Sequence, residues 1–104
     1  MANPPREQAL YVVTRNDLSP SARAVQSGHA VAQFLLEHKT DWKNGTLVYL
    51  KAHNEEHLRE LIGNVKDRNH SIFIEPDLGM SLTSVAVLGP ADPGESLFPD
   101  LRLM

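Results

Sequence analysis

The chain changes from an apolar strand to a long helix between Ala9-Leu10-Tyr11-Val12-Val13-Thr14 and Ser19-Pro20. The first segment is nearly all apolar and rich in β-branched and aromatic residues, which is typical of a strand covered on both faces. Ser19 is a favourable N-cap and Pro20 suits the first helical turn. No helix breaker follows before about His38, so the sequence predicts a central strand followed by a long helix.

The long helix is predicted to be covered over much of its surface. One stripe and its flanks are apolar, and small residues are frequent, which would let the helix backbone approach the sheet closely. Gly28 costs about 1 kcal/mol relative to alanine in a helix interior, and close packing explains its presence. The stripe comprises Ala22, Val25, His29, Ala32 and Leu36, widened by Ala24, Val31, Phe34 and Leu35.

The rest of the chain continues the alternation of strands and helices. Strands are predicted at residues 46–50, 71–74 and 84–88, and a helix capped by Asn54 has apolar residues at i, i+3, i+4 and i+7 spacing up to Val65. Helical connections favour parallel pairing. The order β-α-β-α-β-β predicts an α/β sandwich around a mixed four-stranded sheet.

We expect one domain spanning residues 1–104, with an N-terminal extension at 1–8 and a tail at 91–104 packed on the body. The tail residues expected to contact the body are Leu97, Phe98, Leu101 and Leu103.

Composition limits the possible locations and partners. The 104 residues contain no cysteine, so disulfides and thiolate chemistry are excluded. The N-terminus lacks the pattern of a secretion signal, and no apolar run reaches the roughly 20 residues of a membrane span. We therefore expect a soluble cytoplasmic protein without membrane association. The net charge of −3 gives no general attraction to nucleic acid, although Arg6, Arg15 and Arg23 offer a local basic patch.

Two clusters carry the candidate chemistry. Asp77 follows a predicted strand, where open α/β sheets place ligand sites, and Ser81 and Ser84 add hydroxyls that would help to orient a water molecule. The alternative is a simple turn in which Asp77 bonds the local backbone. In the long helix, Gln26 and His29 share one face and are suited to proton transfer or to binding a carbonyl; the alternative is a partly buried structural histidine.

Metal and cofactor chemistry are not indicated. His53 and His57 lie one turn apart, but no glutamate occupies position 54 and no third ligand is near in sequence, so a zinc motif is not predicted. Phosphate-cradling glycine loops and nucleophile-elbow motifs are also missing, and we expect no cofactor.

Three motifs resemble the type II peptidyl-tRNA hydrolase family. Arg15-Asn16-Asp17-Leu18 resembles the family's Arg-x-Asp-Leu, and Gln26-Ser27-Gly28-His29-Ala30 resembles its Gln-Cys-Gly/Ala-His-Ala. Asp77-Leu78-Gly79-Met80-Ser81 resembles its Asp-Ala-Gly-Arg-Thr, with Gly89-Pro90 closing the last strand. The resemblance implies a three-layer α/β/α domain, commonly a homodimer, that cleaves the ester between a peptide and tRNA.

The departures from the family pattern leave two main hypotheses. The family's helix-start lysine is missing, since Ser19-Pro20-Ser21-Ala22 stands there, and Met80 replaces an arginine. In the first hypothesis the chain is a hydrolase in which Asp77 orients water. Ser81 or Ser84 assists, Gln26 and His29 shape the pocket, and Arg15 and Arg23 contact the tRNA backbone. In the second it is a catalytically silent relative that binds RNA or a protein. A small-ligand sensor domain is a third reading, based on layout alone.

Overall fold

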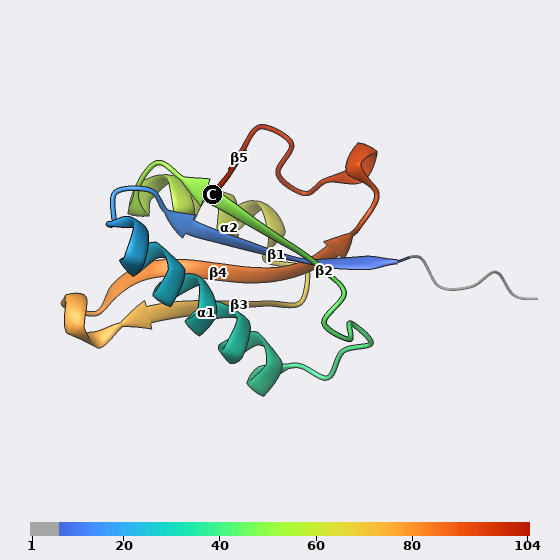
Figure 1. Cartoon of the computed structure of the whole chain (residues 1–104), viewed down its shortest axis with the longest axis horizontal. Coiled ribbons are helices and arrows are strands. Elements are labelled where there is room, and N and C mark those ends of the chain that lie inside the picture. Colours follow the sequence, from blue (N-terminus) through green and yellow to red (C-terminus); the bar gives the residue numbers. More distant parts are fainter. Residues whose placement is uncertain (1–6) are drawn as a thin grey trace, which may run out of the picture.

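A computed structural model describes residues 7–104 as a mixed α/β fold, as the sequence predicts (Figure 1). The elements in chain order are β1 (Gln8–Arg15), α1 (Pro20–Glu37), β2 (Thr46–Ala52), α2 (Glu55–Val65), β3 (His70–Glu75), the 3-10 turn η1 (Pro76–Leu78), β4 (Ser81–Pro90), the 3-10 turn η2 (Pro93–Glu95) and β5 (Arg102–Leu103). Most of the predicted N-terminal extension, including Arg6, lies outside the described residues, and Gln8 already belongs to β1.

Within residues 7–104 the sheet has five strands in the order β3-β4-β1-β2-β5, whereas the sequence predicted four. β1 pairs with β2 in parallel, and the other three pairs are antiparallel. The additional strand is β5, which pairs Leu50 with Leu103 and Lys51 with Arg102. Two residues are too short to show a strand pattern, so the prediction missed the strand at this edge of the sheet.

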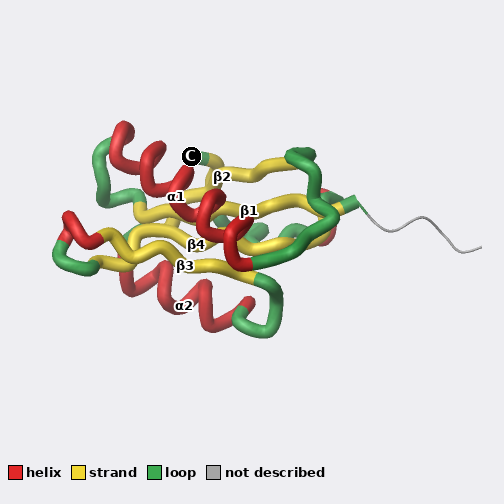
Figure 2. Tube along the Cα trace, turned by 90° about the horizontal axis from the view of Figure 1, so that it is seen from below, coloured by secondary structure: helices red, strands yellow, loops and turns green. Residues whose placement is uncertain are grey.

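β1 lies between two hydrophobic cores because successive residues of a strand point to opposite faces. Ala9, Tyr11 and Val13 join the core beneath α2, which is completed by Leu58 and by Phe98 of the tail. On the other face, a second core holds Leu10, Val12, Ala30, Phe34, Trp42 and Ala86 beneath α1. The two helices therefore cover different faces of the sheet (Figure 2).

The tail packs on the α2 side of the sheet for most of its length. Leu97 and Leu101 pack against the core, and Phe98 is only 5% exposed. The prediction is wrong for Leu103, which is 70% exposed because it belongs to the outermost strand of the sheet. No helix within residues 7–104 is both long and apolar enough to cross a membrane.

The predicted central stripe of α1 is wrong, because four of its five residues are exposed, but its predicted flank Phe34 is buried against the sheet. Its buried residues are Gln26, Ser27, Ala30 and Phe34. Two of these are polar and find hydrogen-bond partners in the sheet, so hydrophobicity alone indicated the wrong side.

The exposed side of α1, called here the α1 outer face, consists of Ala24, Val25, Gly28, His29, Ala32, Leu35 and Leu36. Leu36 is 82% exposed and Val25 is 55% exposed. A Cβ atom built on Gly28 meets nothing within 4 Å, so close packing against the sheet does not explain this glycine.

Candidate functional site

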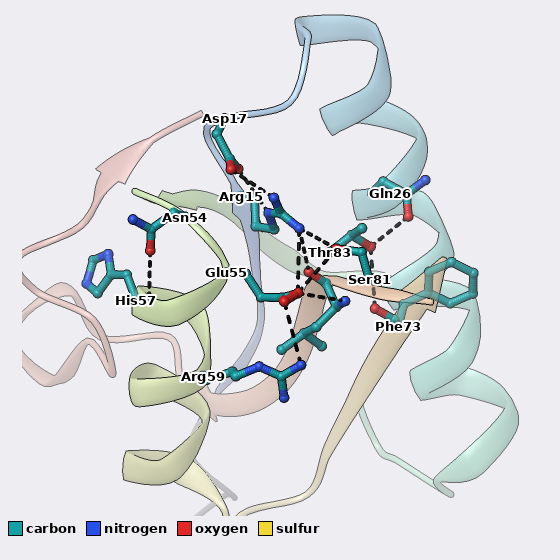
Figure 3. A network of polar contacts seen from close by, with 11 residues as sticks. Arg15, Asp17, Gln26, Asn54, Glu55, His57, Arg59, Phe73, Ser81 and Thr83 are labelled. Atoms are coloured by element: carbon teal, nitrogen blue, oxygen red, sulfur yellow. Dashed lines mark hydrogen bonds and ion pairs between the residues drawn. The ribbon is translucent and has the colours of Figure 1, made fainter. Parts of the chain in front are cut away.

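Arg15 ends β1 and is the centre of a polar cluster at the edge where both parallel strands finish, the usual ligand edge of open α/β sheets (Figure 3). Its guanidinium binds Asp17 in a bidentate manner, with Nε to Oδ1 at 2.9 Å and Nη2 to Oδ2 at 2.8 Å. Its Nη1 donates to Ser81 Oγ and to the carbonyl of Leu82 at 3.3 Å. The hydrogen bond between the two side chains raises the pKa of Arg15 and lowers the pKa of Asp17. Arg15 is thus engaged within the protein.

Glu55, the first residue of α2, completes this cluster. Its Oε2 accepts hydrogen bonds from Ser81 Oγ and from the backbone N–H of Leu82, both at 3.2 Å, and lies 3.7 Å from Arg15 Nη1. Its Oε1 lies 3.7 Å from Arg59 Nη2. In the sequence, Glu55 is only an acid in the first turn of the helix that Asn54 caps, a position that the helix dipole favours, and its polar partners come from distant strands. The Ser81 hydroxyl therefore accepts from one charged group and donates to another.

A β-bulge aims two hydroxyls at Gln26 of α1. Phe73 pairs with Ser84 while the next residue of β3 pairs with Leu82, which makes Thr83 the extra residue of β4. Thr83 Oγ1 donates to Gln26 Oε1 at 2.7 Å, and Ser84 Oγ donates to the Gln26 backbone carbonyl at 2.8 Å. All three residues are buried. Sequence analysis missed Thr83, since nothing in the chain marks the position of the bulge.

The neighbouring turn of α1 is held to β1 by a second pair of hydroxyls. Thr14 Oγ1 and Ser27 Oγ lie 2.8 Å apart, and Ser27 Oγ also lies 2.7 Å from the backbone carbonyl of Arg23, which it can reach as a donor. The Arg23 guanidinium hydrogen bonds to Asn16 through Nη1. Arg23 therefore lies beside the end of β1, but its partner is a neutral side chain.

Asp77 lies in the exposed turn η1 between β3 and β4. Gly79 ends this turn with φ +65°, and its N–H donates to the carbonyl of Pro76 at 3.2 Å. Met80, also at positive φ, is 65% exposed. Asp77 is exposed, and within residues 7–104 no hydrogen bond or ion pair holds its carboxylate.

His29 is stacked on Phe73 at the surface of the α1 side. The ring centroids are 4.4 Å apart and the ring planes are inclined by only 10°. His29 is exposed, and no hydrogen bond to its imidazole is found in the described part of the chain. The ring therefore covers Phe73 and belongs to neither polar cluster.

The structure divides the five predicted catalytic residues among separate places. In the helix–sheet interface, the Ser84 hydroxyl donates a hydrogen bond to the backbone carbonyl of Gln26. Ser81 belongs to the Arg15–Glu55 cluster. Among residues 7–104, no hydrogen bond or ion pair joins Asp77 or His29 to these groups.

The described residues also contain no group of three or more histidine, cysteine or acidic side chains that could hold a metal. The imidazole rings of His53 and His57 are stacked with their centroids 4.7 Å apart, and the backbone N–H of His53 donates a hydrogen bond to His57 Nδ1.

Comparison with known proteins adds evidence about the fold alone. No family model matches the sequence, and no curated protein matches it. The solved structure of Atu0240, a protein of unknown function from Agrobacterium tumefaciens strain C58, is similar with a TM-score of 0.69 and 11% sequence identity. The match covers 93% of this chain and 97% of that chain.

Proposed function

We propose that this protein is a catalytically silent relative of the type II peptidyl-tRNA hydrolases that functions as a protein-binding module through the α1 outer face. The observation that carries the proposal is the exposure of this face. Between Ser21 and Glu37, every exposed position of α1 is apolar, glycine or histidine, and none is an acid, lysine or arginine. Large exposed apolar patches mark interaction sites more often than ordinary surface.

The state of the polar residues supports a silent role. A general base or nucleophile needs a free lone pair within reach of its substrate, and a general acid needs a proton that it can transfer. The side-chain carbonyl of Gln26 and the hydroxyl of Ser84 are buried and used within the fold, and the hydroxyl of Ser81 is used by Arg15 and Glu55. The family's lysine is also missing from the start of α1, and Arg23 does not replace it as a proton donor, because a guanidinium stays protonated at ordinary pH.

A second copy of this chain is the partner that fits the α1 outer face. The face is neutral, so it offers no charge for recognition by an acidic or basic partner. An antiparallel two-fold contact centred on Gly28 would place Ala24 opposite Ala32 of the second copy, and these small residues permit a close helix approach. Such a contact is isologous, as in most homodimers. Leu36 would lie at the periphery and cover the small central residues.

The oligomeric state tests this assignment. We expect a concentration-dependent dimer in sedimentation experiments on the intact protein, and Leu36→Glu to shift the equilibrium to monomer by placing a charge in the apolar contact. Met80→Glu is the matched control, since Met80 is also a largely exposed apolar residue but lies outside α1, and it should leave the equilibrium unchanged. A protein that stays monomeric at high concentration would overturn the proposed partner.

A hydrolase remains the second candidate because the Asp77 carboxylate is free and accessible in the turn that precedes Ser81. In this case tRNA is the substrate, and Asp77 orients water after the substrate completes the site. Deacylation of N-blocked aminoacyl-tRNA distinguishes the two candidates. Our proposal expects no turnover above that of a buffer blank, whereas turnover that Asp77→Asn abolishes would establish the hydrolase and refute a silent role.

A further inference from the structure

Two cations face each other across the β2–β5 pair. Lys51 and Arg102 are direct partners in the antiparallel register, which places their side chains on the same face of the sheet. Like charges directly opposite each other in an antiparallel pair are destabilising. This arrangement weakens a strand pair of only two residues, so its presence suggests a negatively charged group between the two side chains.

Lys51 and Arg102 have no ion-pair partner among the described residues, although Asp100 lines the same pocket. Arg15, at the same edge of the sheet, provides the contrast, because Asp17 and Glu55 both lie within ion-pair distance of it. The fold therefore neutralises one cation at this edge and leaves two others available.

These cations line a pocket beyond the ends of the parallel strands. Its walls are formed by Asn16, Lys51, Ala52, His53, Asp100, Leu101 and Arg102. Arg23 lies next to this pocket, since its guanidinium donates a hydrogen bond to the side chain of Asn16. Asp100 is the single carboxylate of the lining, so the cationic side chains exceed it in number. The position matches the edge where open α/β sheets bind ligands.

We propose that this pocket binds a phosphate group between Lys51 and Arg102, with His53 and the Asn16 amide as further hydrogen-bond donors. Arginine offers a planar fork of donors that matches phosphate oxygens, and lysine adds a compact charge. The bound anion would remove the repulsion between the two side chains and stabilise β5. The site involves other residues than the α1 outer face, so it is independent of the proposed function.

The test is a titration of the full chain with inorganic phosphate, in which binding is measured from the amide NMR shifts and from the melting temperature. We expect saturable shifts at Lys51, His53 and Arg102, together with a raised melting temperature. Lys51→Met and Arg102→Met should each weaken phosphate binding by about tenfold or more, while Lys39→Met, at an exposed lysine elsewhere, should leave it unchanged.

A second readout separates binding from a merely structural role. Without phosphate, Lys51→Met should melt at a higher temperature than the wild type, because it removes the repulsion in the β2–β5 pair. Titrations with adenosine monophosphate and with a short RNA then identify the source of the phosphate. Tighter binding of the mononucleotide indicates a small ligand. Tighter binding of the RNA, with an affinity that falls steeply with added salt, indicates a polymer. Shifts that do not saturate, or unchanged affinity in both variants, would overturn the proposal.

Discussion

Gly28→Ala should stabilise the isolated chain, although Gly28 lies in the middle of its longest helix. Glycine is about 0.8–1.0 kcal/mol less favourable than alanine in a helix interior. The added Cβ meets no atom within 4 Å, so no steric penalty offsets the gain. The entropy of unfolding is about 2.1 cal/mol/K per residue, or roughly 220 cal/mol/K for the 104 residues. The free-energy gain therefore corresponds to an increase of about 4 °C in melting temperature.

Gly63→Ala is the matched control, because Gly63 belongs to α2 and a Cβ there also meets nothing within 4 Å. Both variants should be more stable in urea or thermal unfolding at concentrations where the chain is monomeric. The two should differ in association. The methyl group at position 28 lies in the centre of the proposed α1 contact and should weaken the dimer, whereas the methyl group at position 63 should not.

A loss of stability in dilute Gly28→Ala would contradict the open space around Gly28, since it would mean that another part of the chain packs on α1 at this position. Equal association of Gly28→Ala, Gly63→Ala and the wild type would instead remove α1 from the dimer contact.

Two further predictions concern the polar clusters. Thr83→Val should cost about 1–3 kcal/mol in urea unfolding, because it leaves the buried side-chain carbonyl of Gln26 without its donor; an unchanged stability would contradict this assignment of the hydrogen bond. Asp17→Asn should cost at most about 1 kcal/mol at pH 7, since the carboxylate is partly exposed. Arg15 lowers the pKa of Asp17 from its usual 3.8, so this contribution is present above about pH 4 and is lost as the pH falls through the folded-state pKa. Unfolding curves of wild type and variant should therefore converge in acid, and a difference that persists at low pH would contradict the ion pair.

The candidate site was only partly predictable. Gln26, Ser81 and Ser84 were predicted from the sequence as catalytic residues, and this role stays a prediction; the structure gives each of them a buried or partly buried polar partner. Their partners Glu55 and Thr83 were missed as site residues. Glu55 looks like an ordinary first-turn acid in sequence, and Thr83 becomes a partner of α1 only through the bulge. Both roles depend on contacts between segments far apart in the chain.

The order of the elements from β1 to β4 and the burial of β1 on both faces could be predicted from the residues alone, because they follow from local spacing: apolar runs, the Ser19-Pro20 start and the Asn54 cap. The side of α1 that meets the sheet and the fifth strand at residues 102–103 are set by contacts between distant segments. The physical reason is that a buried Gln26 is favourable only once Thr83 is near enough to bond it, and a two-residue strand forms only on the edge that β2 presents. Both the Gln26–Thr83 contact and the pairing edge of β2 form only when segments far apart in the sequence come together.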